Sequence, residues 1–307
     1  MGILLTQLNF VLTASPSWDG LLSWTGRLIA ALVVLILIRA LYEPGSLDIT
    51  HQTLISQHPA SNQLAVRVAL FSDLHADLLR IKPKVLIAAL LDTPVDLLIF
   101  LGDLASKDEK AGKATWFLSQ IAAAAHQANI PFLAVPGNHD GVNAHRVMCE
   151  AGLDLLKNEQ RSVITASGVR LMITGLSDLH TGSPNPQLLK TDKERMSSDE
   201  QIRIVLAHNP DTILKLPLDG GDFFFSGHFH GGQIYAPLQM EFRLLRSDIL
   251  PRQGIWRGVF SMLGYCGYIT RGLGCVWLPL RFLSKPELTI LDLIRSVDGL
   301  LLDPPNL

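Results

Sequence analysis

Histidine, aspartate and asparagine side chains gather in five short turns of this sequence. In chain order the turns contain Asp73 and His75, then Asp103, then Asn138, His139 and Asp140, then His208, and last His228 and His230. Five of the ten histidines of the chain fall in these turns. Taken singly, such residues more often cap helices, form turns or make structural hydrogen bonds. Taken together, carboxylate oxygen, amide oxygen and imidazole nitrogen without thiolate predict a hydrolytic site for Mn, Fe or Zn ions.

Each of these turns follows a short apolar segment that is typical of a buried β-strand. The predicted strands cover 64–71, 95–101, 130–136, 169–176, 202–208, 222–226 and 287–293, and the predicted helices cover 78–92 and 113–129. The last strand alternates apolar and polar residues, as a half-exposed strand would. Continuously apolar strands that alternate with helices predict an α/β fold with buried sheets. Such sheets place ligands at the carboxyl ends of their strands, where these turns lie.

An apolar segment near the N-terminus predicts a membrane anchor. Residues 21–42 contain only two charged side chains, Arg27 and Arg39. A helix of about 20 apolar residues crosses the hydrocarbon core of a bilayer, although a buried N-terminal helix is the alternative interpretation. Residues 1–20 carry no Lys or Arg, which argues against a cleaved signal. The same lack of basic residues favours a single span with the large domain on the cytoplasmic side.

The composition changes along the chain suggest four parts. We expect an anchor over 1–43, a polar linker over 44–63, the main domain over 64–295 and a tail over 296–307. A net charge of −2 does not indicate a nucleic-acid partner. Three scattered cysteines are too few for a disulfide framework or a zinc knuckle.

The order of the five turns identifies a family. Asp73-x-His75, Gly102-Asp103, Gly137-Asn138-His139-Asp140, His208 and Gly227-His228-x-His230 together resemble the calcineurin-like metallophosphoesterases. The resemblance covers roughly residues 64–293, the main domain, and all five motifs in this order are highly specific. It implies a four-layer α/β/β/α sandwich that holds two divalent metal ions, with Mn favoured over Fe or Zn, and hydrolyses phosphoesters.

The resemblance also implies a role for each residue of the turns. One ion would be held by Asp73, His75, Asp103 and His230, and the second by Asp103, Asn138, His208 and His228. Two cations about 3.5–4 Å apart activate water and clamp the phosphoryl oxygens. His139 would stabilise developing charge or protonate the leaving oxygen. Asp140 would assist catalysis by orienting His139 or the turn.

A second copy of the "SDLH" motif lies outside the family pattern. It occupies residues 177–180, between the Asn138 turn and His208. Asp178 and His180 could line the mouth of the substrate site, but a surface turn is the favoured interpretation.

Three features near the C-terminus narrow the substrate class. The motif "GHFHGGQ" over 227–233, "GYITRGLG" over 267–274 and "KPELTILDL" over 285–293 are similar to a bacterial subgroup that often carries an N-terminal membrane segment. Phe229 stands where that subgroup usually has Thr, between two ligands. One class of the subgroup hydrolyses the diphosphate of UDP-2,3-diacylglucosamine in lipid A synthesis, which implies location at a bacterial inner membrane.

The segment 249–286 contains no acidic residue but five basic and many aromatic ones, so it is either a lipid-facing surface or part of the core. The alternatives to the lipid A substrate are another phospholipid, a soluble nucleotide, or a catalytically dead binding scaffold.

Overall fold

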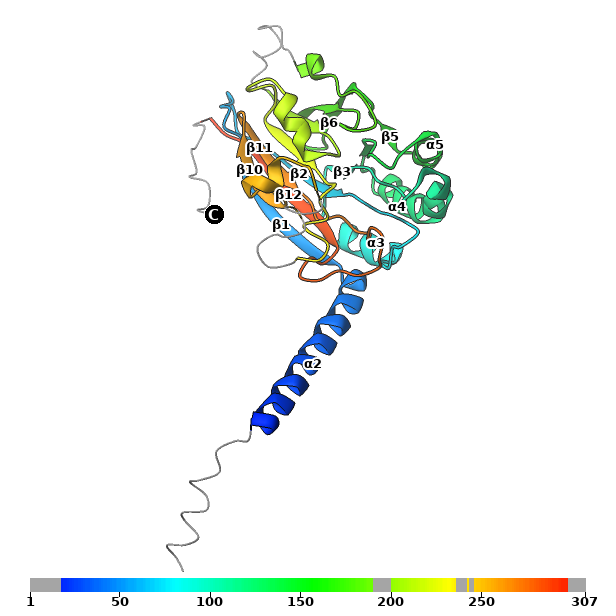
Figure 1. Cartoon of the computed structure of the whole chain (residues 1–307). Helices are drawn as coiled ribbons and strands as arrows, with labels where there is room; N and C mark the ends of the chain where they lie inside the picture. Colours follow the sequence, from blue (N-terminus) through cyan, green and yellow to red (C-terminus); the bar gives the residue numbers. More distant parts are fainter. Residues whose placement is uncertain (1–17, 190–199, 236–241, 243–245, 298–307) are drawn as a thin grey trace, which may run out of the picture.

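The predicted apolar strands form the centre of two six-stranded β-sheets (Figure 1). The computed structural model describes residues 18–189, 200–235, 242 and 246–297. The first sheet has the order β1 (Asp48–Ile55), β12 (Glu287–Arg295), β2 (Leu64–Phe71), β3 (Leu97–Phe100), β4 (Phe132–Ala134) and β5 (Asp154–Leu155). The second has the order β10 (Gly258–Met262), β11 (Tyr265–Ile269), β9 (Phe223–Ser226), β8 (Gln201–Leu206), β7 (Arg170–Gly175) and β6 (Glu159–Ile164).

Side chains from both sheets meet in a central hydrophobic layer, because the central strands are apolar on both faces. The outer face of the first sheet packs against α3 (Pro83–Asp92), α4 (Thr115–Gln127) and α5 (Val142–Glu150). The short 3₁₀ helix η2 (Asp108–Ala114) leads into α4. The predicted α/β sandwich with two sheets is confirmed.

The outer face of the second sheet packs against a different kind of layer. Within the described residues it is covered by the 3₁₀ helices η4 (Pro210–Lys215) and η6 (Leu250–Gln253), by η3 (Pro186–Leu189) and by loop residues. Phe224 and Tyr265 of the sheet pack into this layer beside Phe229 and Phe242. Much of the aromatic content of 249–269 is therefore core, as one of the two interpretations of that segment expected.

The predicted linker over 44–63 is wrong for its central residues. After the 3₁₀ helix η1 (Glu43–Gly45), residues 48–55 form β1, which pairs in parallel with β12 over its whole length. β1 is an edge strand with mostly exposed side chains. Its polar composition resembles a linker for this reason.

The last strand differs from its prediction as well. β12 lies between β1 and β2, so its side chains face the helices on one side and the second sheet on the other. Seven of its nine residues are buried, including Glu287 and Thr289. A half-exposed strand was expected, but both of its faces are covered. The expected tail over 296–307 lies outside the described residues beyond residue 297.

The helix α2 (Trp18–Tyr42) extends away from the folded domain (Figure 1). Residues Ser23–Gly45 are long and apolar enough to cross a membrane, and only 6% of the most apolar window is buried. The alternative of a buried N-terminal helix is therefore wrong for the described part of α2. Arg39 near the end of the helix forms an ion pair with Glu43.

Candidate metal centre

The five predicted turns converge at one edge of the sandwich. β2, β3 and β4 are parallel, as are β7, β8 and β9, and each ligand turn follows the carboxyl end of its strand. Backbone hydrogen bonds join the turns: the Asp73 amide donates to Gly102 and the Gly227 amide to His208. We call this side of the sandwich, where β2, β3, β4, β8 and β9 end, the metal-bearing edge.

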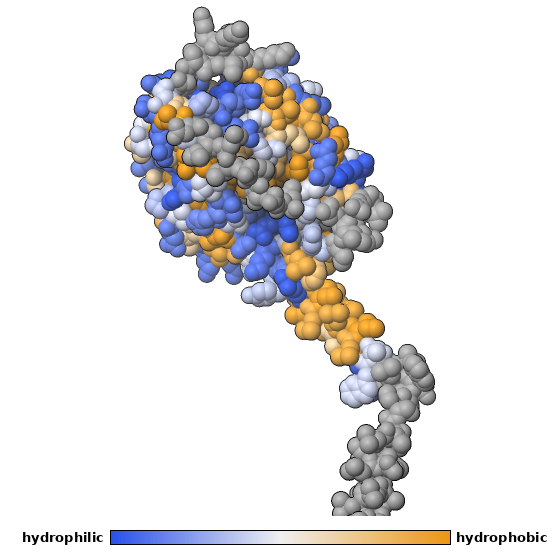
Figure 2. Space-filling view, turned by 90° about the vertical axis from the view of Figure 1, so that its left-hand side faces the viewer, coloured by the Kyte–Doolittle hydropathy of each residue, from blue (hydrophilic) through white to orange (hydrophobic). Residues whose placement is uncertain are grey.

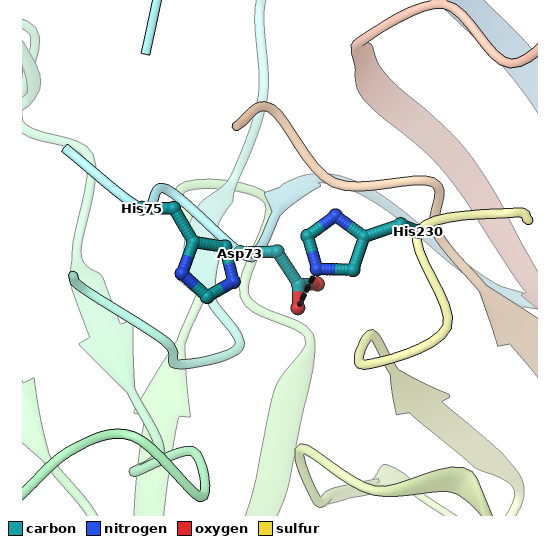
Figure 3. Close-up of side chains that lie close together, drawn as sticks. All are labelled: Asp73, His75 and His230. Carbon is teal, nitrogen blue, oxygen red and sulfur yellow. Dashed lines mark ion pairs between the residues drawn. The ribbon is translucent and has the colours of Figure 1, made fainter. Parts of the chain in front are cut away.

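The side chains on this edge form two adjacent groups. Asp73, His75 and His230 form one group, and Asp103, His208 and His228 form the other, with ligand atoms within 4.8 Å of one another in each. Figure 3 shows the first group, in which His230 Nε2 lies 3.2 Å from Asp73 Oδ1. In the second, His208 Nε2 lies 3.1 Å from Asp103 Oδ2. The groups meet where His208 Nε2 approaches Asp73 Oδ1 at 4.0 Å.

Several ligand atoms in these groups have no hydrogen-bond partner among the described residues. They are both ring nitrogens of His75, Asn138 Oδ1 of the neighbouring turn, and Asp73 Oδ1, whose contact at 3.2 Å is with His230 Nε2, another candidate ligand atom; all are buried. Leaving a buried donor or acceptor unpaired costs about 1–3 kcal/mol, so folded proteins rarely tolerate several in one place. The donor set of oxygen and nitrogen atoms fits divalent cations. The residues present therefore fit a metal site.

The charges of the site favour a cation. Burial works to raise the pKa of Asp73, but the charges of His230 and His208 hold it well below its usual range. The pKa of Asp103 is lowered in the same way, against burial, by His208 and His75. Both carboxylates are thus ionised at neutral pH, which metal ligands must be.

The pKa values of the buried residues His75 and His208 are shifted in opposite directions. Burial lowers the pKa of His75 to about 3, so its ring is neutral and offers a lone pair. Burial also acts on His208, but the charge and hydrogen bond of Asp103 raise its pKa to about 10. His208 Nδ1 donates to the Leu101 carbonyl at 2.7 Å, so its Nε2 is the atom aimed at the carboxylates. The negative potential that favours a proton on His208 favours a cation in the same place.

Asp140 holds two of the turns together. Its Oδ2 accepts hydrogen bonds from the amides of Asp103 and Gly137, both at 2.8 Å, and its Oδ1 accepts one from Leu104. Burial and the neighbouring Asp103 raise its pKa to about 6. Both of its oxygens are engaged by backbone amides, an arrangement that fits the predicted role of Asp140 in orienting the turn that carries His139.

The backbone of the ligand turns is unusual. Asp73, His75, Asp103, His228 and His230 all have positive φ, between +38° and +70°. Few non-glycine residues adopt this left-handed conformation, and such residues cluster at functional sites. The turns are also packed closely, since a Cβ at Gly137 would lie 2.2 Å from Asp103 Oδ1.

Arg281 lies next to the predicted ligands, in the segment 249–286 that was expected to be either a lipid-facing surface or part of the core. Its side chain is fully buried, donates to the carbonyls of Gly272 and Gly274, and lies 3.4 Å from His230 Nδ1. The interpretation of 249–286 as a lipid-facing surface is therefore wrong for Arg281. A buried guanidinium satisfied by main-chain carbonyls has no pattern in the sequence that could have revealed it.

Asp248 is a second residue that the sequence did not single out. Its Oδ1 lies 3.7 Å from His228 Nε2 and 3.8 Å from His180 Nε2. Burial opposes the shift, but His228 lowers the pKa of Asp248 to about 2. It can orient the imidazole of His228 from the side away from His208.

The second "SDLH" motif divides between its two interpretations. Asp178 forms a turn, because its Oδ1 accepts hydrogen bonds from the amides of His180 and Thr181. The ring of His180 lies 2.9 Å from Asn209 Nδ2 and, between centroids, 5.9 Å from His228. His180 is half exposed, so it lies at the rim of the site.

Two sheets that end in clustered carboxylates and imidazoles are typical of a metal-dependent hydrolase. The family profile of calcineurin-like phosphoesterases matches residues 66–232, more than half of the chain. The uncharacterized metallophosphoesterase YkuE of Bacillus subtilis is 30% identical over 82% of this chain and 87% of its own. The phosphodiesterase YaeI of Escherichia coli is 29% identical over 76% and 84%. The chain belongs to the calcineurin-like metallophosphoesterase family and is a hydrolase.

A further relative matches a shorter part of the chain. The UDP-2,3-diacylglucosamine pyrophosphatase LpxG of Chlamydia trachomatis is 35% identical over 39% of this chain and 36% of its own length. The match with the Chlamydia muridarum protein of the same name is 40% over 29% of this chain.

Proposed function

We propose that this protein is a membrane-anchored hydrolase that cleaves the diphosphate of UDP-2,3-diacylglucosamine and releases UMP, a step of lipid A biosynthesis. The observation that carries the chemistry is the pair of adjacent ligand groups with unpaired buried atoms. The lipid-linked substrate is supported by the exposed apolar helix α2 and by the similarity to the two LpxG proteins.

In this proposal the two ligand groups bind two divalent cations. Asp73, His75 and His230 would hold one ion, Asn138, His208 and His228 would hold the other, and Asp103 would contribute to both. When bound, the cations supply an activated water and neutralise charge on the phosphoryl oxygens. Manganese is favoured over iron and zinc, and the carboxylates bind with their protons already lost.

His139 is the proposed proton donor and charge stabiliser. Its amide donates to Asp103 Oδ1 at 2.9 Å, which fixes the turn that carries it. Its ring lies 5.4 Å from that of His75, between centroids, at the border of the buried cluster. From there the imidazole can stabilise a developing phosphoryl charge or protonate the leaving oxygen. Asp140 positions this turn through the hydrogen bond that it accepts from the Gly137 amide.

The proposed location follows from α2. A single span would hold the protein at a bacterial inner membrane, with Arg39 and the catalytic domain on the cytoplasmic side. The partners are then the membrane and a lipid-linked phosphoester, without nucleic acid.

Incubation of the full chain in detergent with UDP-2,3-diacylglucosamine and Mn²⁺ tests the substrate. We expect release of UMP, and His139→Ala serves as the control that separates enzyme from contaminant. Absence of UMP, while a soluble aryl phosphodiester is still hydrolysed, would remove the lipid A substrate and retain the metallophosphoesterase.

A second candidate is a phosphodiesterase that acts on another phospholipid or a soluble nucleotide. It is favoured by the longer match with the phosphodiesterase YaeI than with the LpxG proteins. Comparison of turnover on bilayer-embedded and soluble diesters separates these substrates. A protein that bound no metal and hydrolysed none of them would be a binding scaffold.

A further inference from the structure

The helix α2 joins the folded domain on the metal-bearing edge. β1 begins at Asp48, a few residues after α2 ends at Tyr42, and pairs in parallel with β12. β12 runs antiparallel to β2, so that Thr289 near the start of β12 pairs with Leu70 at the end of β2. The first residues of β1 and β12 therefore lie beside the turn that carries Asp73. If α2 crosses a bilayer, the ligand turns are on the side of the domain nearest to that bilayer.

A loop between β11 and β12 packs against the last turn of α2. The Arg281 amide donates to the Ala40 carbonyl at 3.0 Å, and the Ser284 amide donates to Glu43 Oε2 at 3.2 Å. The guanidinium of Arg39 lies over the ring of Phe282, 5.6 Å from its centroid. These contacts fix the loop to the place where α2 leaves the domain.

Large apolar side chains are exposed around this junction. We name them the membrane rim: Tyr42, Ile234, Trp277, Leu278 and Leu283. Trp277 is 89% exposed and Tyr42 is 73% exposed. Figure 2 shows hydrophobic residues along α2 and at the base of the domain where the helix meets it. Trp and Tyr side chains are enriched at membrane–water interfaces because one end is apolar and the other is polar.

The backbone holds two of these side chains outward at an energetic cost. Trp277 and Leu283 have φ of +65° and +57°, a region that bulky residues rarely adopt. A left-handed residue costs about 1–3 kcal/mol and persists only where its surroundings impose it. The surrounding loop therefore holds Trp277 and Leu283 in this conformation, and both side chains are exposed.

The same loop is connected to the metal ligands. Gln233 lies three residues after His230, and its Nε2 donates to the carbonyls of Val276 and Leu278 at 3.0 and 3.1 Å. Its Oε1 accepts from the Val276 amide at 2.6 Å. Arg281 of the loop lies against His230 on the other side. One side chain thus bridges a ligand turn and the backbone of the membrane rim.

We propose that the membrane rim rests in the interfacial region of the bilayer, so that the metal-bearing edge faces the membrane and takes substrate from its surface. This proposal depends on the membrane location of α2 proposed above. The occupant is the lipid headgroup region, because the rim surrounds the exit of the apolar helix.

Fluorescence quenching in vesicles tests the position of the rim. The full chain, with its three cysteines replaced by Ala, is reconstituted in phosphatidylethanolamine and phosphatidylglycerol vesicles. Three variants each carry one polarity-sensitive dye: Trp277→Cys on the rim, Trp116→Cys on α4 and Leu35→Cys in the middle of α2. Trp116 is a matched control because it is also an exposed tryptophan, at 65%. Circular dichroism checks the fold, and Leu278→Cys replaces the rim position if Trp277→Cys does not fold.

Lipids that carry a spin label near the headgroup should quench the dye at 277 at least about twofold more than the dye at 116. If the dye at 35 is quenched by deep labels while that at 277 behaves like that at 116, the rim proposal is overturned and the anchor stands. If the dye at 35 is not quenched either, both fall. This readout requires no substrate, so failure of the lipid A assignment leaves it intact.

A kinetic measurement tests the use of the rim. The probe is an aryl phosphodiester with a long alkyl chain, embedded in the same vesicles, and its soluble counterpart is the control. The double variant Trp277→Ser, Leu278→Ser should lower kcat/KM for the embedded probe by roughly tenfold and leave that for the soluble probe unchanged. Equal loss on both probes, or no loss on the embedded one, would overturn the proposal.

Discussion

The two edges of the sandwich contain similar buried polar side chains, but these side chains differ in how fully they are hydrogen-bonded. On the metal-bearing edge, Asn138 Oδ1 and both nitrogens of His75 are buried without hydrogen-bond partners among the described residues. On the opposite edge, where β9 begins and β12 ends, Asp222 is fully buried but both of its oxygens are bonded. The composition of the two clusters does not distinguish them, whereas the number of unpaired polar atoms does: among the described residues the cluster around Asp222 has one, His58 Nδ1, against both nitrogens of His75 and Asn138 Oδ1 on the metal-bearing edge.

The cluster around Asp222 is a structural one. Its Oδ2 accepts from the amide of Arg203 at 2.7 Å, and its Oδ1 accepts from Ser56 Oγ at 3.1 Å and from the Arg203 guanidinium at 3.2 Å. His58 Nδ1 lies 3.1 Å away and Arg295 Nε 3.9 Å away. These contacts tie β1, β8, β9 and β12 together at their ends. Buried polar groups that saturate one another stabilise a fold, and those left unpaired indicate a ligand.

Replacement of one histidine by alanine on each edge should give the largest difference in metal content and kcat. His75→Ala should lose metal and lower kcat by roughly 10⁴-fold or more, because bound cations supply several kcal/mol of transition-state stabilisation. His58→Ala on the opposite edge should keep both metals and near wild-type kcat. Elemental analysis and hydrolysis of an aryl phosphodiester measure the two effects. Retention of metal by His75→Ala would show that the unpaired imidazole is not a ligand.

Replacement of one aspartate by asparagine on each edge should affect stability in the opposite way. The variant on the opposite edge should be the more destabilised one. Asp222→Asn leaves buried arginines without their partner, which costs about 3–5 kcal/mol in the free energy of unfolding. Asp73→Asn keeps one side-chain oxygen for the His228 amide, which donates to Asp73 Oδ2 at 3.0 Å, so the metal-free variant should lose less stability, relative to the metal-free wild type, than Asp222→Asn does. Urea unfolding in detergent, followed by tryptophan fluorescence, checks both. A strongly destabilised Asp73→Asn would make the metal-bearing edge structural as well.

A variant of His139 tests whether this residue of the metal-bearing edge assists catalysis without binding metal. His139→Ala should keep both metals and lower kcat by roughly 10²–10³-fold, since it removes proton donation and charge stabilisation but no ligand. His180→Ala, at the rim of the site, is the matched control and should change KM more than kcat. Loss of metal from His139→Ala would contradict the role proposed for it.

Low pH should reduce the contribution of Asp222 to the free energy of unfolding, and this is the smallest of the four expected effects. Burial opposes the shift, but His58 and Arg203 lower the pKa of Asp222 to about 2. A lowered folded-state pKa contributes stability above the unfolded pKa of about 3.9, and this contribution is lost as the pH falls through about 2. The difference in unfolding free energy between wild type and Asp222→Asn should therefore shrink by about 2 kcal/mol between pH 4 and 2. A constant difference over that range would contradict the assignment of the shift to Asp222.

The central strands and all five ligand turns were predictable from the sequence. Strands β2, β3, β4, β8 and β9 are short and mostly apolar, and a glycine or a predicted ligand follows each within three residues, so the apolar pattern and the position of the turns agree. The first helix illustrates a limit of such patterns. The helix α3 was expected from residue 78, but it begins at Pro83, because proline is favoured at the first position of a helix.

The surroundings of β1 and β12 could not be predicted in the same way. β1 pairs on one side alone and has a polar sequence, so only its partner β12, some 240 residues away, determines it. For β12 the error has the opposite origin: its polar residues are buried, since Tyr268 donates to Glu287 at 2.8 Å. Cross-strand pairing over long separations is not visible in local periodicity.

The residues that surround the ligands were the hardest to predict. Asp248 and Arg281 belong to no motif, and a charged residue is expected to be exposed unless its partner is known. In both cases the partners, His228 and the carbonyls of Gly272 and Gly274, come from other parts of the chain.

The left-handed backbone of the five ligands has a consequence for the descent of this protein. At these positions glycine would relieve strain, so a copy released from hydrolysis would gain stability by losing its ligands. Decay of the activity would therefore begin at Asp73, His75, Asp103, His228 and His230 and not at random.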